Sequence, residues 1–388
     1  MPADPALFRS IEAGDRFIGL MSGTSLDGVD GVLLQARSQT EWSVTEAVHA
    51  DLPAPLRAEL LALNTSGPDE LHRSALAANG LMGCYAQVVG LLLQRQGLPP
   101  AAIRAIGAHG QTVRHQPAPA GQRPDAAASW AAYTLQLGNP ALLAELTGIA
   151  VVADFRSRDV AAGGQGAPLV PAFHHALFGR PSMDLAVANV GGMANLTLLP
   201  ANGDVTGFDT GPGNVLMDSW CERHLGTPFD TDGQWAAQGQ VLTDWLQQLL
   251  AHPYFHQTGP RSTGRDLFNA EWLDRQLALA QPAPRPVDVQ ATLAELTART
   301  ISAALPPSVE RLLMCGGGAL NAHLMRRLRL LKPKVDVNTT AWAGVPVMDV
   351  EAAAFAWLAA RTMAGLPGNV TAVTGAAGPR ILGAVYPA

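Results

Sequence analysis

The chain has 388 residues, of which 48% are hydrophobic and 15% are charged, and its formal net charge is −6. Single hydrophobic cores stop growing at about 250–300 residues, so this length favours two domains. The negative charge provides no basic field for nucleic acid or for an anionic membrane surface, and neither is expected as a partner.

The first predicted element is a strand, a glycine turn and a second strand over Phe17–Leu34. In the turn, Ser22-Gly23-Thr24-Ser25, small residues let backbone N–H groups and hydroxyls approach an anion such as phosphate. Asp27 and Asp30 follow in the second strand, where a carboxylate facing the turn would hold the water shell of a Mg²⁺ ion. An ordinary hairpin with a glycine turn is the alternative for this stretch taken alone.

The rest of the first half alternates strands and helices. Ala108–Thr112 lies where one predicted strand ends, the usual position of ligands in open α/β sheets. His109 in this segment is a candidate for orienting a sugar hydroxyl, although a half-buried histidine without a ligand is the more common case. The predicted elements are strands over Trp42–Ala50, Ile103–Gly107, Tyr133–Leu137 and Ala150–Asp154, and helices over Leu71–Gln96 and from Pro140.

The second half begins near Phe155 and repeats this pattern. Leu185–Leu199 is again an apolar strand, a turn at Gly191 and Gly192, and an apolar strand. Two similar halves indicate a duplication with a cleft between the copies. The further elements are a strand over Val205–Asp209, helices over Gly213–Leu225, Gln234–Leu250 and up to Leu305 with Asp288 as its N-cap, a strand over Arg311–Cys315, a turn at Gly316–Gly318, and helices over Ala319–Leu331 and Val350–Met363, the last packing back towards the hinge.

This pattern predicts an α/β protein with two lobes and a nucleotide between them. We place the N-terminal lobe at residues 1–154, with 366–388 packing back on it, and the C-terminal lobe at residues 155–365. The turns at Gly23–Ser25 and Gly191–Gly192 would hold the phosphates, and the turn formed by Gly316, Gly317 and Gly318 would lie against the adenosine. The architecture is similar to the actin, hexokinase and heat-shock chaperone ATPase superfamily, a duplicated ribonuclease H-like fold that closes around ATP and Mg²⁺ in an interdomain cleft.

Asp209 is the candidate general base. It ends an apolar strand just before a rigid Thr-Gly-Pro-Gly turn and a predicted helix, so its carboxylate would be held by rigid elements. A turn or N-cap role is the simpler alternative. An aspartic protease would need a second Asp-Thr-Gly, which the sequence does not contain.

Other residues are weaker candidates for substrate binding. Arg156 or Arg158 would bind an anionic substrate group, preferably a carboxylate in a bidentate manner, and an ion pair is an equally good interpretation. Glu351, with Asp349 two residues earlier, opens the last long helix, where the helix dipole alone favours acids. His174 and the histidine after it lack the spacing and carboxylate partners of a metal site.

Six motifs together resemble the anhydro-N-acetylmuramic acid kinase family. The resemblance runs from about Phe17 to the C-terminus and implies an enzyme of peptidoglycan recycling. Such an enzyme uses ATP and water to convert 1,6-anhydro-N-acetylmuramic acid into N-acetylmuramic acid 6-phosphate. The motifs are Ile18–Asp30, Gly107–Thr112, Val152–Arg156 with Asp159–Pro168, Gly207–Asn214, Ser262–Arg265 and Cys315–Gly318.

The resemblance also implies roles for individual residues. Asp209 would activate water against the anomeric carbon, with Arg158 and Glu351 near the sugar. A homodimer is implied as well, and three cysteines without a Cys-x-x-Cys pair are typical of the reducing cytoplasm. The ATP phosphate loop would comprise Gly23, Thr24, Ser25, Leu26, Asp27, Gly28, Val29 and Asp30, with Mg²⁺ held through ATP and water.

Two features depart from the family pattern, and two other functions stay open. The extension before Phe17 and the excursion Pro117–Ala132 bear on packing or loop closure rather than on activity. A conventional sugar kinase would use Asp209 to deprotonate the substrate hydroxyl directly. A non-enzymatic ATP-binding module of the actin-like fold would need a peptide-binding appendage or filament surfaces, and no extra domain is evident in the sequence.

Overall fold

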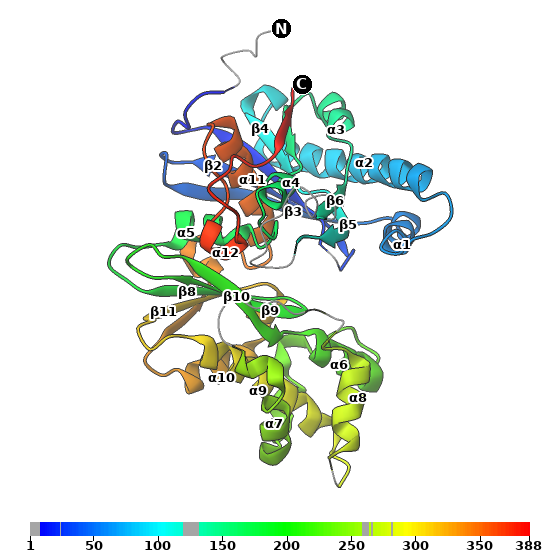
Figure 1. The fold of residues 1–388 in the computed structure, drawn as a ribbon, viewed down its shortest axis with the longest axis vertical. Coiled ribbons are helices and arrows are strands. Elements are labelled where there is room, and N and C mark those ends of the chain that lie inside the picture. The colour runs from blue at the N-terminus through cyan, green and yellow to red at the C-terminus, as the bar shows by residue number, and fades with distance from the viewer. Residues whose placement is uncertain (1–7, 24, 119–131, 258–263, 265–266, 281) are drawn as a thin grey trace. The chain divides into compact units, whose positions relative to one another are not determined.

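The computed structural model describes residues 8–23, 25–118, 132–257, 264, 267–280 and 282–388. The chain forms two compact units, which are described separately. Unit 1 comprises Met1–Leu177 with Asp349–Ala388, and unit 2 comprises Phe178–Met348. Each unit is an α/β body built on one main sheet (Figure 1).

Unit 1 has a six-stranded sheet in the order β13-β7-β4-β1-β2-β3. The first three strands form an antiparallel meander, β4 and β7 run parallel to β1, and β13 pairs antiparallel with β7. A separate hairpin pairs β5 with β6. The strands are β1 Arg16–Met21, β2 Gly28–Ala36, β3 Trp42–Asp51, β4 Ala105–Ala108, β5 Gln111–Gln116, β6 Tyr133–Leu137, β7 Val151–Ala153 and β13 Ala384–Tyr386.

Alternate residues of each strand point to opposite faces of the sheet, and helices cover the side chains on both faces. Ile18 and Leu20 pack into a core with Leu81 of α2 and Leu143 of α3. The other face carries α11. The helices are α1 Ala54–Ala62, α2 Glu70–Gln96, η1 Pro100–Ala102, α3 Pro140–Thr147, α4 Ser157–Ala161, α5 Val170–Phe178, which runs across the boundary between the units, α11 Val350–Met363 and α12 Thr371–Thr374.

Unit 2 has a five-stranded sheet in the order β10-β9-β8-β11-β12. Its first three strands are antiparallel, and β11 and β12 run parallel to β8. The strands are β8 Leu185–Val190, β9 Met193–Leu199, β10 Thr206–Pro212, β11 Arg311–Cys315 and β12 Asp336–Thr339, and the helices are α6 Val215–Leu225, η2 Thr231–Gly233, η3 Ala236–Gln238, α7 Thr243–Leu250, η4 Pro253–His256, α8 Ala270–Ala278, α9 Pro286–Ala304, η5 Gly317–Leu320, α10 Ala322–Leu331 and η6 Thr340–Ala343.

The two sheets share one topology. Leaving out β13, the orders β3-β2-β1-β4-β7 and β10-β9-β8-β11-β12 match strand for strand, with three antiparallel strands followed by two parallel ones. This confirms the duplicated α/β fold predicted from the sequence. The cleft between the halves stays a prediction.

The compact units have different boundaries from the predicted lobes. Residues 155–177 and 349–365 belong to unit 1, whereas the sequence analysis placed them in the C-terminal lobe. Residues 349–365 join unit 1 because α11 packs closely on its sheet. A Cβ atom at Gly19 of β1 would overlap the carbonyl oxygen of Ala352, and one at Gly107 of β4 would overlap that of Phe355.

Two details of the predicted helices are wrong. Arg285, not Asp288, is the N-cap of α9, because Pro286 occupies its first turn. Asp288 lies inside the helix and accepts hydrogen bonds from Arg285 and from the backbone N–H of Gln240. The predicted helix over Gln234–Leu250 is interrupted after η3, where the backbone at Gly239 is extended.

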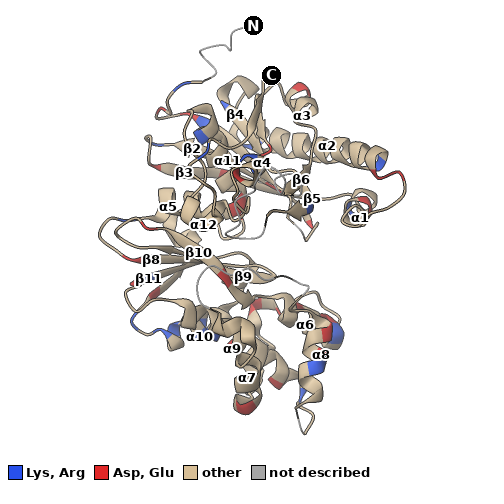
Figure 2. Cartoon of the chain, viewed as in Figure 1, with Lys and Arg blue, Asp and Glu red and all other residues tan. Residues whose placement is uncertain are grey.

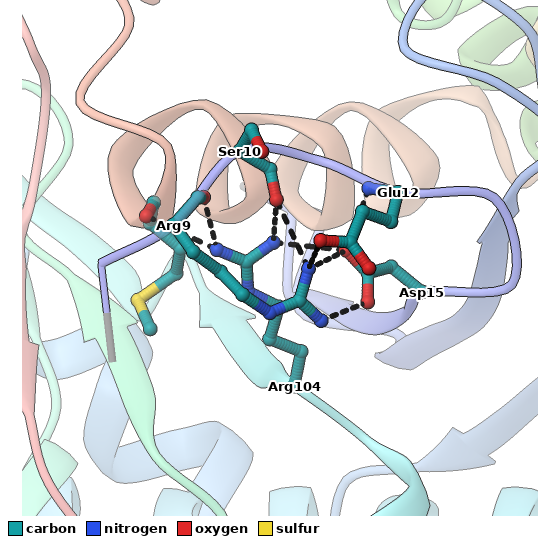
Figure 3. A network of polar contacts seen from close by, with 6 residues as sticks. Arg9, Ser10, Glu12, Asp15 and Arg104 are labelled. Atoms are coloured by element: carbon teal, nitrogen blue, oxygen red, sulfur yellow. Dashed lines mark hydrogen bonds and ion pairs between the residues drawn. The ribbon is translucent and has the colours of Figure 1, made fainter. Parts of the chain in front are cut away.

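The segment before β1 is anchored to unit 1 by a buried ion pair (Figure 3). Arg104 donates to the Asp15 carboxylate at 2.9 Å, and both side chains are 9% exposed. Arg104 also donates to the backbone carbonyls of Ser10 and Arg9 and to that of Met363 at the end of α11. Arg9 binds Asp15 from the other side. The described part of the N-terminal extension is therefore a docked element of unit 1.

Charge and hydropathy add two observations. Figure 2 shows Lys and Arg interspersed with Asp and Glu over both units. Among the described residues, α2 is the one helix long and apolar enough to cross a membrane, and half of its most apolar stretch is buried inside the structure. Core helices of globular proteins commonly pass the same test, so this is weak evidence for a membrane span.

Candidate active site

The predicted phosphate loop lies between β1 and β2 of unit 1. Gly23, Ser25, Leu26 and Asp27 form the connection, and Thr24 lies outside the described residues. The Asp27 carboxylate accepts hydrogen bonds from the Ser25 hydroxyl at 2.8 Å and from the N–H of Gly28 at 3.0 Å. Leu26 is buried with a φ of 56°, a conformation that non-glycine residues seldom adopt. The loop is thus held in a defined shape by its own side chains.

Gly28, Val29 and Asp30 are the first residues of β2. The side chain of Val29 is fully buried in the core, so its part in a nucleotide site would come from its backbone. Asp30 is paired with His49 of β3, whose Nδ1 lies 2.7 Å from the carboxylate. Burial raises the pKa of Asp30 despite this contact, and the carboxylate raises the pKa of His49 despite partial burial.

A second acid of unit 1 lies close to Asp30. Burial and the negative charge of Asp30 raise the pKa of Asp349, which directly precedes α11, to about 6. The Asp27 charge also raises the pKa of Asp30. Within the described residues no group of three side chains is arranged to ligate a metal ion directly. Asp27, Asp30 and Asp349 form a group of carboxylates within unit 1, in which the charge of one raises the pKa of the next.

The segment after β4 is tied by one hydrogen bond to β1 and by two to the connection that follows β1. The N–H of His109 donates to the carbonyl of Leu20 at 3.0 Å, and the Ser22 hydroxyl donates to the carbonyl of Gly110 at 3.3 Å. The side-chain amide of Gln111 donates to the carbonyl of Gly23 at 3.2 Å. Gln111 is 1% exposed. The motif Gly107–Thr112 therefore holds this connection in place, and His109 within it is also a candidate sugar contact.

His109 and Glu351 are brought together by Arg156. The Nε and Nη2 atoms of Arg156 lie 3.1 and 3.0 Å from the Nε2 of His109, and Nη1 donates to the carbonyl of Gly166 at 2.8 Å. Burial and the Arg156 charge lower the pKa of His109 well below its usual value. Burial raises the pKa of Glu351, and the nearby Arg156 charge opposes this shift. Burial lowers the pKa of Arg156 to about 10.

Arg158, the arginine predicted to lie near the sugar, is exposed on the short helix α4. The next residue, Asp159, is fully buried. Its carboxylate accepts hydrogen bonds from the N–H of Gly166 and from the side chains of Asn369 and Thr374. Asp159 thus fixes the loop that carries Gly166, which in turn positions Arg156.

In unit 2 the two predicted glycine turns lie side by side. The carbonyls of Gly191 and Gly192 accept hydrogen bonds from the N–H groups that open α6, at 2.8–3.1 Å. A Cβ atom at Gly316 would lie 2.5 Å from the Oδ1 of Asn189, and one at Gly317 would lie 3.4 Å from the Nδ2 of Asn214. Gly316 also has a φ of 74°. Gly318 packs so closely on Val190 that no side chain fits there.

Asp209 lies on the same sheet, two strands from β8. It is opposite Asn195 on β9, which is opposite Asn189 on β8. Residues in register on neighbouring strands project to one face, so these three polar side chains form a row that ends beside Gly316. The hydroxyl of Tyr254 donates to the backbone carbonyl of Asp209 at 2.8 Å. A bulge follows between Asp209 and Gly211, a feature that is common next to active sites.

Comparison with known proteins identifies the family. The family model for anhydro-N-acetylmuramic acid kinase matches residues 15–388. The chain belongs to this family. Anhydro-N-acetylmuramic acid kinase of Variovorax paradoxus is 55% identical over 97% of this chain and 100% of its own length. The kinase of the same name from Cupriavidus metallidurans is 53% identical over 100% of both chains.

Solved structures give only distant likenesses. The activator of 2-hydroxyisocaproyl-CoA dehydratase from Clostridium difficile with bound ADPNP is 12% identical, with a TM-score of 0.43, over 90% of this chain and 95% of that chain. Component A of (R)-2-hydroxyglutaryl-CoA dehydratase from Acidaminococcus fermentans is 10% identical, with a TM-score of 0.46, over 90% and 99%. Scores this low support no inference about the present chain.

Three residues at the candidate site of this anhydro-N-acetylmuramic acid kinase were not predicted as site residues from the sequence. His49 and Asn195 became visible only through strand register, since each lies opposite a candidate residue in a neighbouring strand. Gln111 lay inside a quoted motif, but its contact with Gly23 depends on the three-dimensional course of the β4–β5 connection. No local sequence signal distinguishes these residues from ordinary strand residues.

Proposed function

We propose that the chain is an ATP-dependent kinase that opens 1,6-anhydro-N-acetylmuramic acid and phosphorylates it to N-acetylmuramic acid 6-phosphate. The observation that carries the proposal is the family match over nearly the whole chain, which includes every candidate site residue. The duplicated sheet with glycine turns in both halves supports it, because phosphate groups bind where backbone N–H groups are accessible.

The reaction joins two bond changes through one oxygen atom. Asp209 removes a proton from a water molecule, which attacks the anomeric carbon, and the bond from that carbon to the bridging oxygen breaks. The oxygen released on C6 then attacks the γ-phosphoryl group of ATP, and ADP leaves. A positioned general base contributes about 10²–10⁴-fold to such a step. The remaining stabilisation must come from positioning and from charge complementarity around the phosphates.

The nucleotide would be held by the glycine turns of both units. Gly23–Ser25 of unit 1 and Gly191–Gly192 of unit 2 would contact the phosphates, and Gly316–Gly318 would contact the adenosine. A Mg²⁺ ion bound to ATP would neutralise the charge that develops on the phosphates. Asp27 and Asp30 fit a hydrated Mg²⁺ ion, since each carboxylate is held in place by a neighbouring donor.

The sugar would contact unit 1 through His109 and Glu351, which the Arg156 guanidinium connects. We assign a binding role to Arg156 in addition to Arg158, because Arg156 is partly buried and contacts His109, whereas Arg158 is exposed. We also propose that the enzyme acts in the cytoplasm as a homodimer. Sedimentation analysis of the purified protein tests the dimer.

The mass of the product tests the coupled reaction. The sugar must gain one phosphoryl group and one water, and in ¹⁸O-labelled water the label must appear on the anomeric carbon. A phosphorylated product that retains the anhydro bond would contradict the mechanism. A conventional sugar kinase would instead prefer the opened sugar, so comparing kcat/KM for the anhydro and opened forms distinguishes the two functions.

A further inference from the structure

A cavity of about 170 Å³ lies in unit 1 where β4 and β7 end. Met82, Pro140 and Ala153 form an apolar part of its wall, and His109 and Asp154 contribute polar groups. The C-terminal ends of parallel strands are where ligands bind in open α/β sheets. The cavity therefore has both the position and the mixed lining of a ligand subsite.

His109 contributes a buried hydrogen-bond donor that the described residues satisfy poorly. Its Nε2 faces two N–H groups of Arg156 and must accept from them, and its lowered pKa keeps the ring neutral. The single ring proton is therefore assigned to Nδ1. Nδ1 is buried and makes no hydrogen bond of good geometry with the described residues, although the backbone carbonyls of Ser22 and Gly110 lie close enough to oppose the lowering of the ring's pKa. A buried donor without a well-placed acceptor is unfavourable, so an acceptor on a ligand is expected beside it.

Asp154 contributes an acceptor at the same cavity. Its backbone has a φ of 59°, and its Oδ1 accepts a hydrogen bond from the Ser157 hydroxyl at 2.5 Å. A non-glycine residue in this conformation is strained, and such strain is concentrated at functional sites. The negative charge of Asp154 favours a ligand group that donates a hydrogen bond and disfavours a second carboxylate.

We propose that this cavity binds the acetamido group of the substrate, an assignment that rests on the proposed function. The acetamido oxygen accepts from the Nδ1–H of His109, and its N–H donates to Asp154. Its methyl group contacts the apolar wall at Met82 and Pro140. The lactyl carboxylate of the substrate is excluded from this subsite because it would face Asp154. His109 is thus a specificity residue for an N-acylated amino sugar.

A substitution that narrows the cavity by one methyl group tests the assignment. Gly138 lines the cavity, and a Cβ atom there would lie 3.6 Å from the Cε of Met82 and 3.9 Å from the Cα of Gly110, which are ordinary contacts. Gly138→Ala is therefore compatible with the fold. Gly83→Ala is the matched control, because it adds the same methyl group next to Met82 in the sequence with nothing within 4 Å.

The expected result is a selective loss of sugar binding. Gly138→Ala should raise the KM for 1,6-anhydro-N-acetylmuramic acid about tenfold, the usual effect of one methyl group in a tight pocket, and leave the KM for ATP unchanged. Gly83→Ala should change neither. Thermal unfolding of both variants checks that the fold is retained.

The experiment is completed with a sugar analogue that has a hydroxyl in place of the acetamido group. This analogue is tested as a substrate or as a competitive inhibitor. Wild-type and Gly138→Ala enzymes should bind this analogue equally, because it leaves the cavity empty. If Gly138→Ala also weakened binding of the analogue tenfold, the assignment would be overturned. An unchanged KM of Gly138→Ala for the N-acetyl sugar would overturn it as well. If the wild-type enzyme phosphorylated no anhydro sugar at all, the proposed function itself would fail and this assignment with it.

Discussion

Arg156 donates both its Nε–H and an Nη2–H towards a single atom, the Nε2 of His109, at 3.1 and 3.0 Å. This arrangement keeps the histidine neutral and fixes its tautomer. The positive charge of the same guanidinium lowers the pKa of Glu351. One side chain therefore controls the protonation of two candidate substrate contacts.

Replacing Arg156 should change the pH dependence of the enzyme. The Arg156 charge lowers the pKa of both His109 and Glu351, so Arg156→Met should raise both pKa values and move the acidic limb of the kcat/KM profile to higher pH. We also expect a loss of at least about 100-fold at neutral pH, since a partly buried, hydrogen-bonded charge is removed. Arg158→Met is the comparison: it removes the exposed arginine but not the charge beside His109 and Glu351, so its kcat/KM profile should keep the wild-type pH dependence. Profiles that coincide for wild type and Arg156→Met would refute this role.

Gln111→Leu should weaken ATP binding. It removes the hydrogen bond from Gln111 to the carbonyl of Gly23 and so loosens the phosphate loop. One such bond contributes about 1–1.5 kcal/mol, which corresponds to about a tenfold increase in the KM for ATP. Gln136→Leu is the control, because that amide bonds only to Thr112 and Thr134 among the described residues. An equal effect of both substitutions would indicate a general loss of packing instead.

Asp209→Asn should abolish turnover while ATP still binds. The substitution keeps the shape of the side chain and its place opposite Asn195, but an amide cannot take a proton from water. Removal of the general base should lower kcat by about 10²–10⁴-fold. Calorimetry with ATP should give nearly the wild-type Kd. A variant with near-normal kcat would show that another group is the base.

Removing the buried arginine of the N-terminal anchor should destabilise the protein. Arg104→Met leaves the Asp15 carboxylate without its buried partner, and breaking such a pair costs about 3 kcal/mol. Arg9→Met removes the more exposed partner, whose side chain is 38% exposed, and should cost less than about 1 kcal/mol. Urea unfolding measures both free energies. Equal values for the two variants would mean that Arg104 is not the principal anchor.

The buried histidine of α5 should make the protein less stable in mild acid. Burial lowers the pKa of His174 to about 3, whereas the unfolded chain protonates it near pH 6.5. The unfolded state therefore binds more protons below pH 6.5, and the free energy of unfolding should fall by about 1.4 kcal/mol per pH unit for this group. His174→Leu should reduce the slope between pH 6.5 and 5. An unchanged slope would assign the acid sensitivity to other groups.

The sequence predicts the fold well because its signals are local. Apolar runs around Gly23 and Gly191 specify two hairpins, and the repeated pattern of strands specifies the shared topology. The domain boundary predicted at residue 154 differs from the boundary between the two compact units. The helix beginning at Val350 lies at the end of the chain but packs on β1 and β4, and only long-range contacts determine which sheet it joins.

The candidate site is predicted in part for the same reason. Glycine turns and an acid at a strand end are visible as motifs, so the regions around Gly23, Gly316 and Asp209 could be proposed directly. Arg156 and Arg158 are two residues apart and equivalent in sequence, and their different burial follows from the turn after β7. Pairings such as Asp30 with His49 depend on register, which composition does not encode.

Gly19 and Gly107 lie opposite each other on β1 and β4, and the backbone of α11 rests directly on both. No layer of side chains separates helix from sheet at this point, so the two elements form one rigid block. Glu351, in the first turn of α11, is thereby fixed with respect to the loop after β1 at any angle between the two units. The distance between the Glu351 carboxylate and the predicted phosphate loop is therefore set within unit 1 alone.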